Sequence, residues 1–198
     1  YLLYLKKRKK NGRPVDFEPD SKGRAVIICS IIAFISVLPI LTGFISEACD
    51  LPFHLSRIEG MKDAWLDGQF PARINESFLN GRGDMSLTLY PSLTLCVPAF
   101  MRLCGISMLR SYEYFCLILS FFTAYFTWMS IRRITGSYDI GIISAMFYTL
   151  SLYRITNLCL RGAIAEYAAM TFLPLVLAGI YIICFENKKG IIYLTAGL

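Results

Sequence analysis

Ionisable side chains that could do chemistry gather just after the first long apolar run. Glu47, Asp50, His54 and Arg57 are three, four and three residues apart. On a helix these positions fall within one sector roughly 80° wide, so their side chains would face the same way. A carboxylate there could act as a general base, and a cation could stabilise a developing anion. The structural alternative is that Asp50 only caps a helix, His54 extends toward the headgroups, and Arg57 and Glu59 face water.

A second group lies within residues 153–174. Arg154, Arg161 and Glu166 are expected on one face between two apolar runs, and Arg161 is followed by Gly162. The fork-shaped guanidinium of arginine suits bidentate binding of phosphate. An Arg161–Glu166 ion pair, or arginines lying among lipid headgroups, would explain the same pattern. Spacing alone leaves these alternatives open.

The composition is typical of a membrane protein. Of 198 residues, 56% are hydrophobic and only 17% are charged, whereas soluble domains are nearer a quarter charged. The net charge of +6 falls mostly in short loops between apolar runs, which favours membrane topology over nucleic-acid binding. The seven cysteines show no metal-binding spacing, and one histidine excludes a three-histidine zinc site in this chain. Because both ends are apolar, we expect a piece of a longer polytopic protein.

Four apolar runs predict membrane-spanning helices, and a fifth is ambiguous. The four predicted spans are 25–45, 114–131, the short 140–153, and 167–185. The fifth run, 87–105, contains two prolines and Arg102, so it could span the membrane or form a re-entrant or interfacial segment.

Basic residues decide the expected topology. Lys6–Lys10, the pair Arg132 and Arg133, and the pair Lys188 and Lys189 all lie in the cytoplasm if 87–105 does not cross. We therefore expect a four-part organisation. It comprises the end of a preceding span with a basic cytoplasmic loop (1–24), a span (25–45), an extracytoplasmic loop (46–110), and spans with short loops (111–198).

The extracytoplasmic loop is expected to begin with a helix. Asp50 is a good N-cap residue, and Pro52 would lie in the first turn. Apolar side chains recur at helical spacing along one side, which predicts an amphipathic helix on the membrane surface. These residues are Leu51, Leu55, Ile58 and Trp65, with Met61 at the edge.

Three segments carry a resemblance to a known family. The segments "FHLSRIEG…GQFPARI", "LYPSLTL" and "YRITNLCLRGAIAEYAAMTFLPL" resemble the bacterial membrane proteins labelled 6-pyruvoyl-tetrahydropterin-synthase-related, over residues 44–177. That family is similar to the GT-C superfamily of integral-membrane glycosyltransferases. The resemblance implies an all-α, polytopic transmembrane helical bundle, here a fragment with about four spans. It also implies a long first extracytoplasmic loop with juxtamembrane helices.

The resemblance also implies an activity. GT-C enzymes transfer a sugar from a polyprenyl-phosphate carrier to an extracytoplasmic acceptor, with inversion. By position, Asp50 matches their essential acidic residue, which makes it the expected general base. Arg161 is the first choice for stabilising the leaving phosphate, with Arg57 or Arg154 next. The remaining two candidates are His54, which would orient Asp50 or contact the phosphate, and Glu166, which would hold Arg161 in place.

Partners and alternatives follow from the same reasoning. The expected partners are a lipid-linked sugar donor and membrane lipids, with no nucleic acid, at the bacterial plasma membrane. Some GT-C members use a divalent metal ion, but the sequence shows no complete ligand set. The alternative functions are a transporter or flippase for a polyprenyl-linked or anionic lipid, and a non-catalytic membrane protein of cell-envelope polymer assembly.

Overall fold

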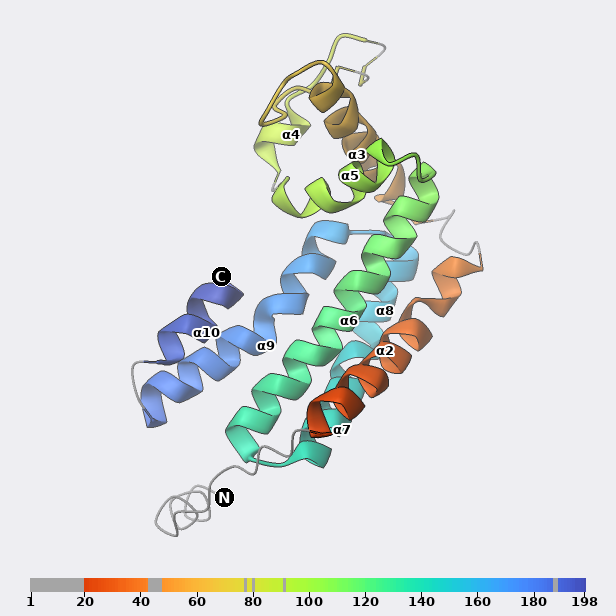
Figure 1. Ribbon diagram of the computed structural model, residues 1–198. Coiled ribbons are helices and arrows are strands. Elements are labelled where there is room, and N and C mark those ends of the chain that lie inside the picture. Colours follow the sequence, from red (N-terminus) through yellow and green to blue (C-terminus); the bar gives the residue numbers. More distant parts are fainter. Residues whose placement is uncertain (1–19, 43–47, 77, 80, 91, 187–188) are drawn as a thin grey trace.

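The fold of the chain is all-α. The computed structural model describes residues 20–42, 48–76, 78–79, 81–90, 92–186 and 189–198 (Figure 1). Within these residues the only strand-like pairing is an isolated bridge between Asn75 and Asp84. The helices are α2 (Asp20–Leu41), α3 (Leu51–Leu66), α4 (Ser86–Leu89), the 3₁₀ turn η2 (Leu93–Leu95), α5 (Cys96–Leu103), α6 (Met108–Thr135), α7 (Tyr138–Thr149), α8 (Leu152–Thr156), the π-helical turn η3 (Asn157–Arg161), α9 (Ile164–Phe185) and α10 (Gly190–Gly197).

Three helices are long and apolar enough to cross a membrane. They are the Lys22–Leu41 part of α2, with 20 residues, α6 with 28 and α9 with 22. Twenty helical residues extend about 30 Å, the thickness of the hydrocarbon core. Three of the predicted spans are therefore confirmed, and the protein is a membrane protein. The first span begins earlier than expected, and residues 43–45 of its predicted end lie outside the described residues.

The short fourth span differs from the expectation of a single helix over 140–153. Helix α7 has only 12 residues, about 18 Å, and ends before Ser151, whose backbone is extended (φ −59°, ψ 142°). The chain then continues through α8 and η3 (Figure 1). Helix α2 contacts both α7 and η3. This part of the bundle is thus made of three short helical pieces in sequence, which we call the broken segment (138–161).

Residues 48–107 form a cap over one end of the bundle (Figure 1). The longest apolar helical stretch in the ambiguous run is Leu93–Leu103, which at 11 residues is too short to span. The described residues of 87–105 therefore contain no helix long enough to span, as the non-spanning interpretation predicts. Arg102 fixes α5 to α3, because its Nε and Nη2 donate to Glu59 at 2.8 and 3.1 Å. These bonds, together with Lys62, lower the pKa of Glu59 to about 2.

The apolar side of α3 does not lie on the membrane surface, so that expectation is wrong. Leu51, Ile58 and Met61 are buried in one core with Tyr112 and Phe115 of α6. The expected amphipathic pattern is present, but α5 and α6 cover it. The large exposed apolar side chains of the cap include three in or near α4 and α5, namely Leu89, Leu93 and Phe100.

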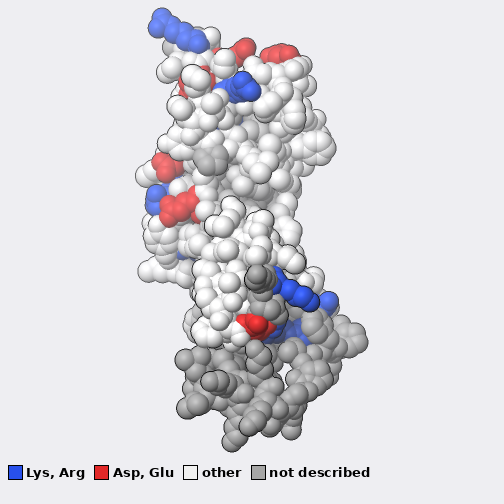
Figure 2. All heavy atoms as spheres, turned by 90° about the vertical axis from the view of Figure 1, so that its left-hand side faces the viewer, with Lys and Arg blue, Asp and Glu red and all other residues white. Residues whose placement is uncertain are grey.

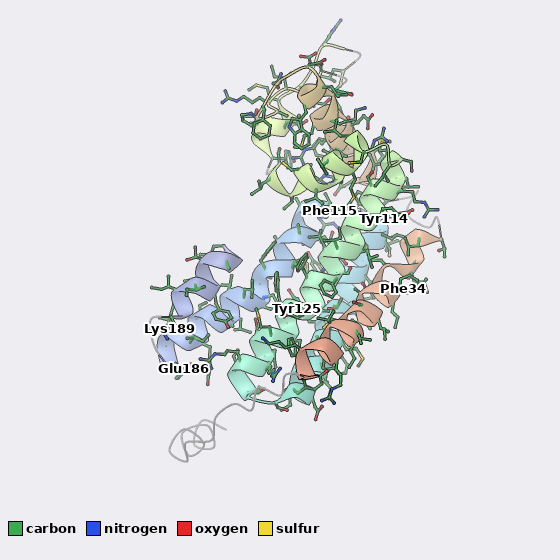
Figure 3. The ribbon with its side chains drawn as sticks, viewed as in Figure 1. Phe34, Tyr114, Phe115, Tyr125, Glu186 and Lys189 are labelled. Carbon is green, nitrogen blue, oxygen red and sulfur yellow. The ribbon has the colours of Figure 1, made fainter. Side chains whose placement is uncertain are left out.

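Arg133 and Lys189 lie at the end of the bundle opposite the cap. Arg133 at the end of α6 donates to Glu186 just after α9, with Nη1 to Oε1 at 3.0 Å. Figure 3 shows Glu186 and Lys189 together at this end. On the face drawn in Figure 2, charged side chains lie in the upper part and near the lower end, with a white band between them. This separation is the pattern expected of a bundle that spans a bilayer.

The orientation expected from the basic residues leads to a labelling prediction. A cysteine at Ser107, exposed at the start of α6, should be labelled by an impermeant maleimide added outside intact cells. The background is a variant without native cysteines, because Cys49 and Cys104 are also exposed on the cap. The matched control is Lys189→Cys at the basic end, which should react only after permeabilisation. The opposite pattern would reverse the topology.

Candidate functional site

The start of α3 and the end of η3 are joined through their backbones. The N–H of Cys49 donates to Leu160 O at 3.1 Å, and that of Asp50 donates to Arg161 O at 2.7 Å. The last carbonyls of a helix have no partner within it, so these N–H groups satisfy them. Asp50 and Arg161, one residue from each of the two clusters of ionisable side chains in the sequence, therefore meet through their backbones at the base of the cap.

Gly162 makes this junction possible. Its φ of +67° is in the left-handed region that glycine adopts without strain. A Cβ at this position would lie 3.1 Å from Leu51 N and 3.2 Å from Ala48 Cβ. The hydroxyl of Tyr112 donates to Gly162 O at 3.3 Å, which holds the turn against α6. The α3 backbone packs closely against residue 162, where a side chain would crowd it.

The exposed polar groups at this junction form what we call the rim: Asp50, Tyr153, Arg161 and Glu166. Asp50 is exposed, and the Arg161 side chain is 47% exposed. Arg161 Nη1 donates to Glu166 Oε2 at 2.8 Å, and Tyr153 donates its hydroxyl proton to Glu166 Oε1. The Arg161–Glu166 ion pair considered from the sequence is thus formed. A guanidinium has five N–H donors, so Arg161 can hold Glu166 and still bind a ligand.

His54 and Arg57 do not share the exposure of Asp50. The side chains of His54 and Arg57 are 5% and 0% exposed. Arg57 lies against a pair of aromatic rings, with Cζ 5.6 Å from the Phe53 centroid and 5.1 Å from that of Tyr90. Its Nη2 donates to Ser92 Oγ at 3.4 Å. Spacing predicted that Asp50, His54 and Arg57 face the same way, but only Asp50 is exposed. The chain around Tyr90 and Ser92 folds over α3 and buries the other two side chains. Glu47 lies outside the described residues.

Burial lowers the pKa of both of these side chains. Burial, and secondarily the Arg57 charge, lowers the pKa of His54 to about 4, although the nearby Asp50 carboxylate opposes the shift. Burial also lowers the pKa of Arg57, against the influence of Tyr90 and Asp84. His54 is therefore a neutral imidazole at physiological pH. As folded, neither side chain is exposed enough to meet a lipid phosphate.

The pKa of His54 predicts a pH-dependent stability. Above pH 6.5 the imidazole is neutral in both folded and unfolded chains, so it contributes no pH dependence. Between about pH 6.5 and 4 the unfolded chain binds the proton first, and stability falls as pH falls. We expect a loss of about 2 kcal/mol between pH 7 and 4.5, measured as thermal unfolding in detergent. The variant His54→Gln should remove this loss, and an equal loss in that variant would contradict the assignment.

Arg154 lies inside the bundle and not on the outer face, which corrects the expectation. Its side chain is 0% exposed. Nη2 donates to Thr123 Oγ1 at 2.9 Å, Nη1 donates to Tyr167 O at 3.4 Å, and Cζ is 4.1 Å from the Tyr167 ring centroid. The sequence shows Arg154 near the end of an apolar run. Only the break before α8 turns its side chain between α6 and α9.

Two polar residues of this region were not anticipated. Tyr153 binds Glu166 at the rim, and Asn157 is 1% exposed next to Arg154. Spacing could have revealed Asn157, because Arg154, Asn157 and Arg161 are three and four residues apart and so share one side of a helix. No spacing pattern in the sequence indicated a role for Tyr153.

An apolar groove of about 340 Å³ lies between α2 and α6. Phe34, which Figure 3 labels on α2, is part of its lining. The groove lies within two predicted spans and can accept a hydrocarbon chain, whereas the charged groups of the rim can do acid–base chemistry. The full lining is Ser30, Ala33, Phe34, Leu117, Ile118, Phe121 and Phe122.

Comparisons with known proteins identified no relative of this chain. Searches of protein-family models, curated proteins and solved structures found no match to this chain. The described residues also contain no group of three histidine, cysteine, aspartate or glutamate side chains that could hold a metal ion. The candidate site therefore rests on its own geometry.

Proposed function

We propose that the protein is a bacterial plasma-membrane glycosyltransferase of the GT-C type. It would transfer a sugar from a polyprenyl-phosphate carrier to an acceptor on the extracytoplasmic side, with the cap facing outward. One observation carries the proposal: Asp50 and Arg161, which are both exposed, are joined by a backbone hydrogen bond at the rim. A base and a cation at the outer end of a membrane bundle are what this transfer needs.

The proposed chemistry uses the rim as follows. Asp50 accepts the proton of the acceptor hydroxyl as its oxygen attacks the anomeric carbon. The new carbon–oxygen bond forms while the bond from that carbon to the carrier phosphate breaks, and the electron pair leaves with the polyprenyl phosphate. Arg161 stabilises the phosphate anion, and Glu166 and Tyr153 hold the guanidinium in place. The apolar groove between α2 and α6 is suited to the carrier chain.

The other sequence-predicted residues have smaller roles in this proposal. His54 touches neither the acceptor nor the phosphate, but its neutral ring sits one turn from Asp50 and packs beside Arg57. Arg57 joins α3 to the segment that contains Ser92. No step is assigned to a metal ion, because the described residues provide no ligand set for the divalent ion that some GT-C enzymes use.

Transport is the second candidate function, and Arg154 is the observation that favours it. Buried ionisable residues within membrane helices often mark pathways for ions or substrates. The protein would then move a polyprenyl-linked or other anionic lipid between leaflets. A non-catalytic role in cell-envelope polymer assembly is the third candidate.

One reconstitution separates these functions. The full-length protein is placed in proteoliposomes with radiolabelled polyprenyl-phosphate sugar, with and without EDTA. Release or transfer of the sugar supports the enzyme, and the EDTA arm reports any need for a divalent ion. Movement of intact label between leaflets supports transport. If folded and correctly oriented protein shows neither transfer nor movement of the label, the enzyme and the transporter are both refuted and the non-catalytic role is left.

A further inference from the structure

Arg154 is a buried cation without a carboxylate partner in the part of the chain that the structure describes. Its hydrogen bonds go to a threonine hydroxyl and to the Tyr167 carbonyl, and its Nε has no partner there. The Tyr167 ring supplies a cation–π contact at 4.1 Å. All of these groups are neutral. Moving a guanidinium out of water is strongly unfavourable unless an opposite charge compensates it, and neutral partners compensate only in part.

A line of polar side chains leads from Arg154 to the rim. Asn157 lies three residues further along the broken segment and is 1% exposed. Neither its side-chain nitrogen nor its side-chain oxygen reaches a hydrogen-bond partner in the described residues. Four residues further, Arg161 and Glu166 form the exposed ion pair. By their spacing of three and four residues, Arg154, Asn157 and Arg161 share one side of the broken segment, buried at Arg154 and exposed at Arg161.

The depth of this line is modest. Arg154 contacts Tyr167, and its partner Thr123 Oγ1 lies 2.9 Å from Thr171 Oγ1. Tyr167 and Thr171 are three and seven residues into α9, so roughly 5 to 10 Å below its first residue. The Arg161–Glu166 pair at the cap end of this line has side chains 47% and 36% exposed, and ion pairs at the surface are weak enough to separate.

We propose that Arg154 and Asn157 form an interior binding site for a phosphate-type oxyanion that enters from the rim. The Nε–H of Arg154 and the amide N–H of Asn157 donate to the oxyanion, and its charge compensates the guanidinium. Inorganic phosphate and the phosphate of a lipid headgroup present the same chemistry. The site is distinct from the transfer reaction and does not depend on the role of Asp50.

The test measures the thermal unfolding midpoint of the full chain in detergent. Inorganic phosphate is titrated against sodium chloride of equal ionic strength. The wild-type midpoint should rise saturably with phosphate, and Arg154→Met should abolish the rise. The matched control is Arg82→Met, an exposed arginine of the cap, which should keep the full response.

Further variants keep the test decisive if Arg154→Met does not fold. Asn157→Leu retains the guanidinium and removes both amide groups, so we expect roughly tenfold weaker phosphate binding. Loss of the response in Arg161→Gln, with full retention in Asn157→Leu, would place the anion at the rim alone and overturn the proposal. An unchanged response in Arg154→Met would overturn it as well.

The source of the phosphate is tested in nanodiscs. These contain phosphatidylcholine alone or with phosphatidate. Stabilisation by phosphatidate in the wild type but not in Arg154→Met identifies a lipid headgroup, and stabilisation by inorganic phosphate only identifies a soluble anion. If neither probe raises the midpoint, Arg154 is an internal hydrogen-bonding side chain and the proposed site does not exist.

Discussion

Replacing Asp50 with asparagine is expected to lower sugar transfer by about 10²- to 10⁴-fold, the usual contribution of a general base. Asparagine keeps the size of the side chain but cannot accept the proton of the acceptor hydroxyl. The folded protein should be unaffected, because the Asp50 side chain makes no capping hydrogen bond to α3 and is exposed. Transfer from labelled polyprenyl-phosphate sugar, at matched amounts of membrane-inserted protein, measures the effect.

The matched control for this variant is Asp67→Asn. Asp67 is an exposed aspartate at the other end of α3, so its replacement makes the same chemical change away from the rim. It should transfer sugar at the wild-type rate. Full activity in Asp50→Asn would remove Asp50 as the base, whereas inactivity of the wild type itself would argue against the transferase.

Replacing Gly162 with alanine is expected to destabilise the protein by about 2 to 4 kcal/mol and to reduce transfer in parallel. A left-handed φ costs a residue with a Cβ about 1 kcal/mol. The rest comes from crowding, because the new Cβ would lie 3.1 Å from Leu51 N and 3.3 Å from Leu51 Cβ. The start of α3 would move away from Arg161, which separates the two sides of the rim. Thermal unfolding and the transfer assay measure the two effects.

Gly68 offers a control with the same backbone conformation. Its φ is +79°, and nothing lies within 4 Å of a Cβ built on it. Gly68→Ala should therefore lose only about 1 kcal/mol and keep full transfer. The difference between the two variants isolates the packing of residue 162 against α3. Equal behaviour of both would mean that the junction does not depend on close approach.

Much of the fold follows from sequence pattern. Uncharged runs of about 20 residues predicted the three long helices, because only a helix satisfies every backbone group in hydrocarbon. The loop position of 87–105 followed from placing the basic pairs on one side, and its short helices agree. The family resemblance and the transferase activity remain predictions, because no comparison tests them.

The broken segment was beyond sequence reasoning for a specific reason. Its apolar residues resemble those of a continuous span. A hydropathy pattern contains no information on the extended backbone at Ser151 or on the π-helical turn that follows α8. These two local features turn Arg154 inward and bring Arg161 to the surface. A helical wheel drawn through the run places Arg154 and Arg161 on one side, but it does not show that one is buried and the other exposed.

By itself the sequence determined an all-α membrane protein, its long helices, the helix that follows Asp50 and the basic end. Those properties depend on neighbours in the chain, through hydropathy, capping residues and charge. Only the tertiary structure decided that Asp50 stays exposed beside Arg161 while His54, Arg57 and Arg154 are buried. Burial depends on which distant segments cover a side chain, and here those segments are the chain around Tyr90 for the cap and α6 and α9 for the bundle.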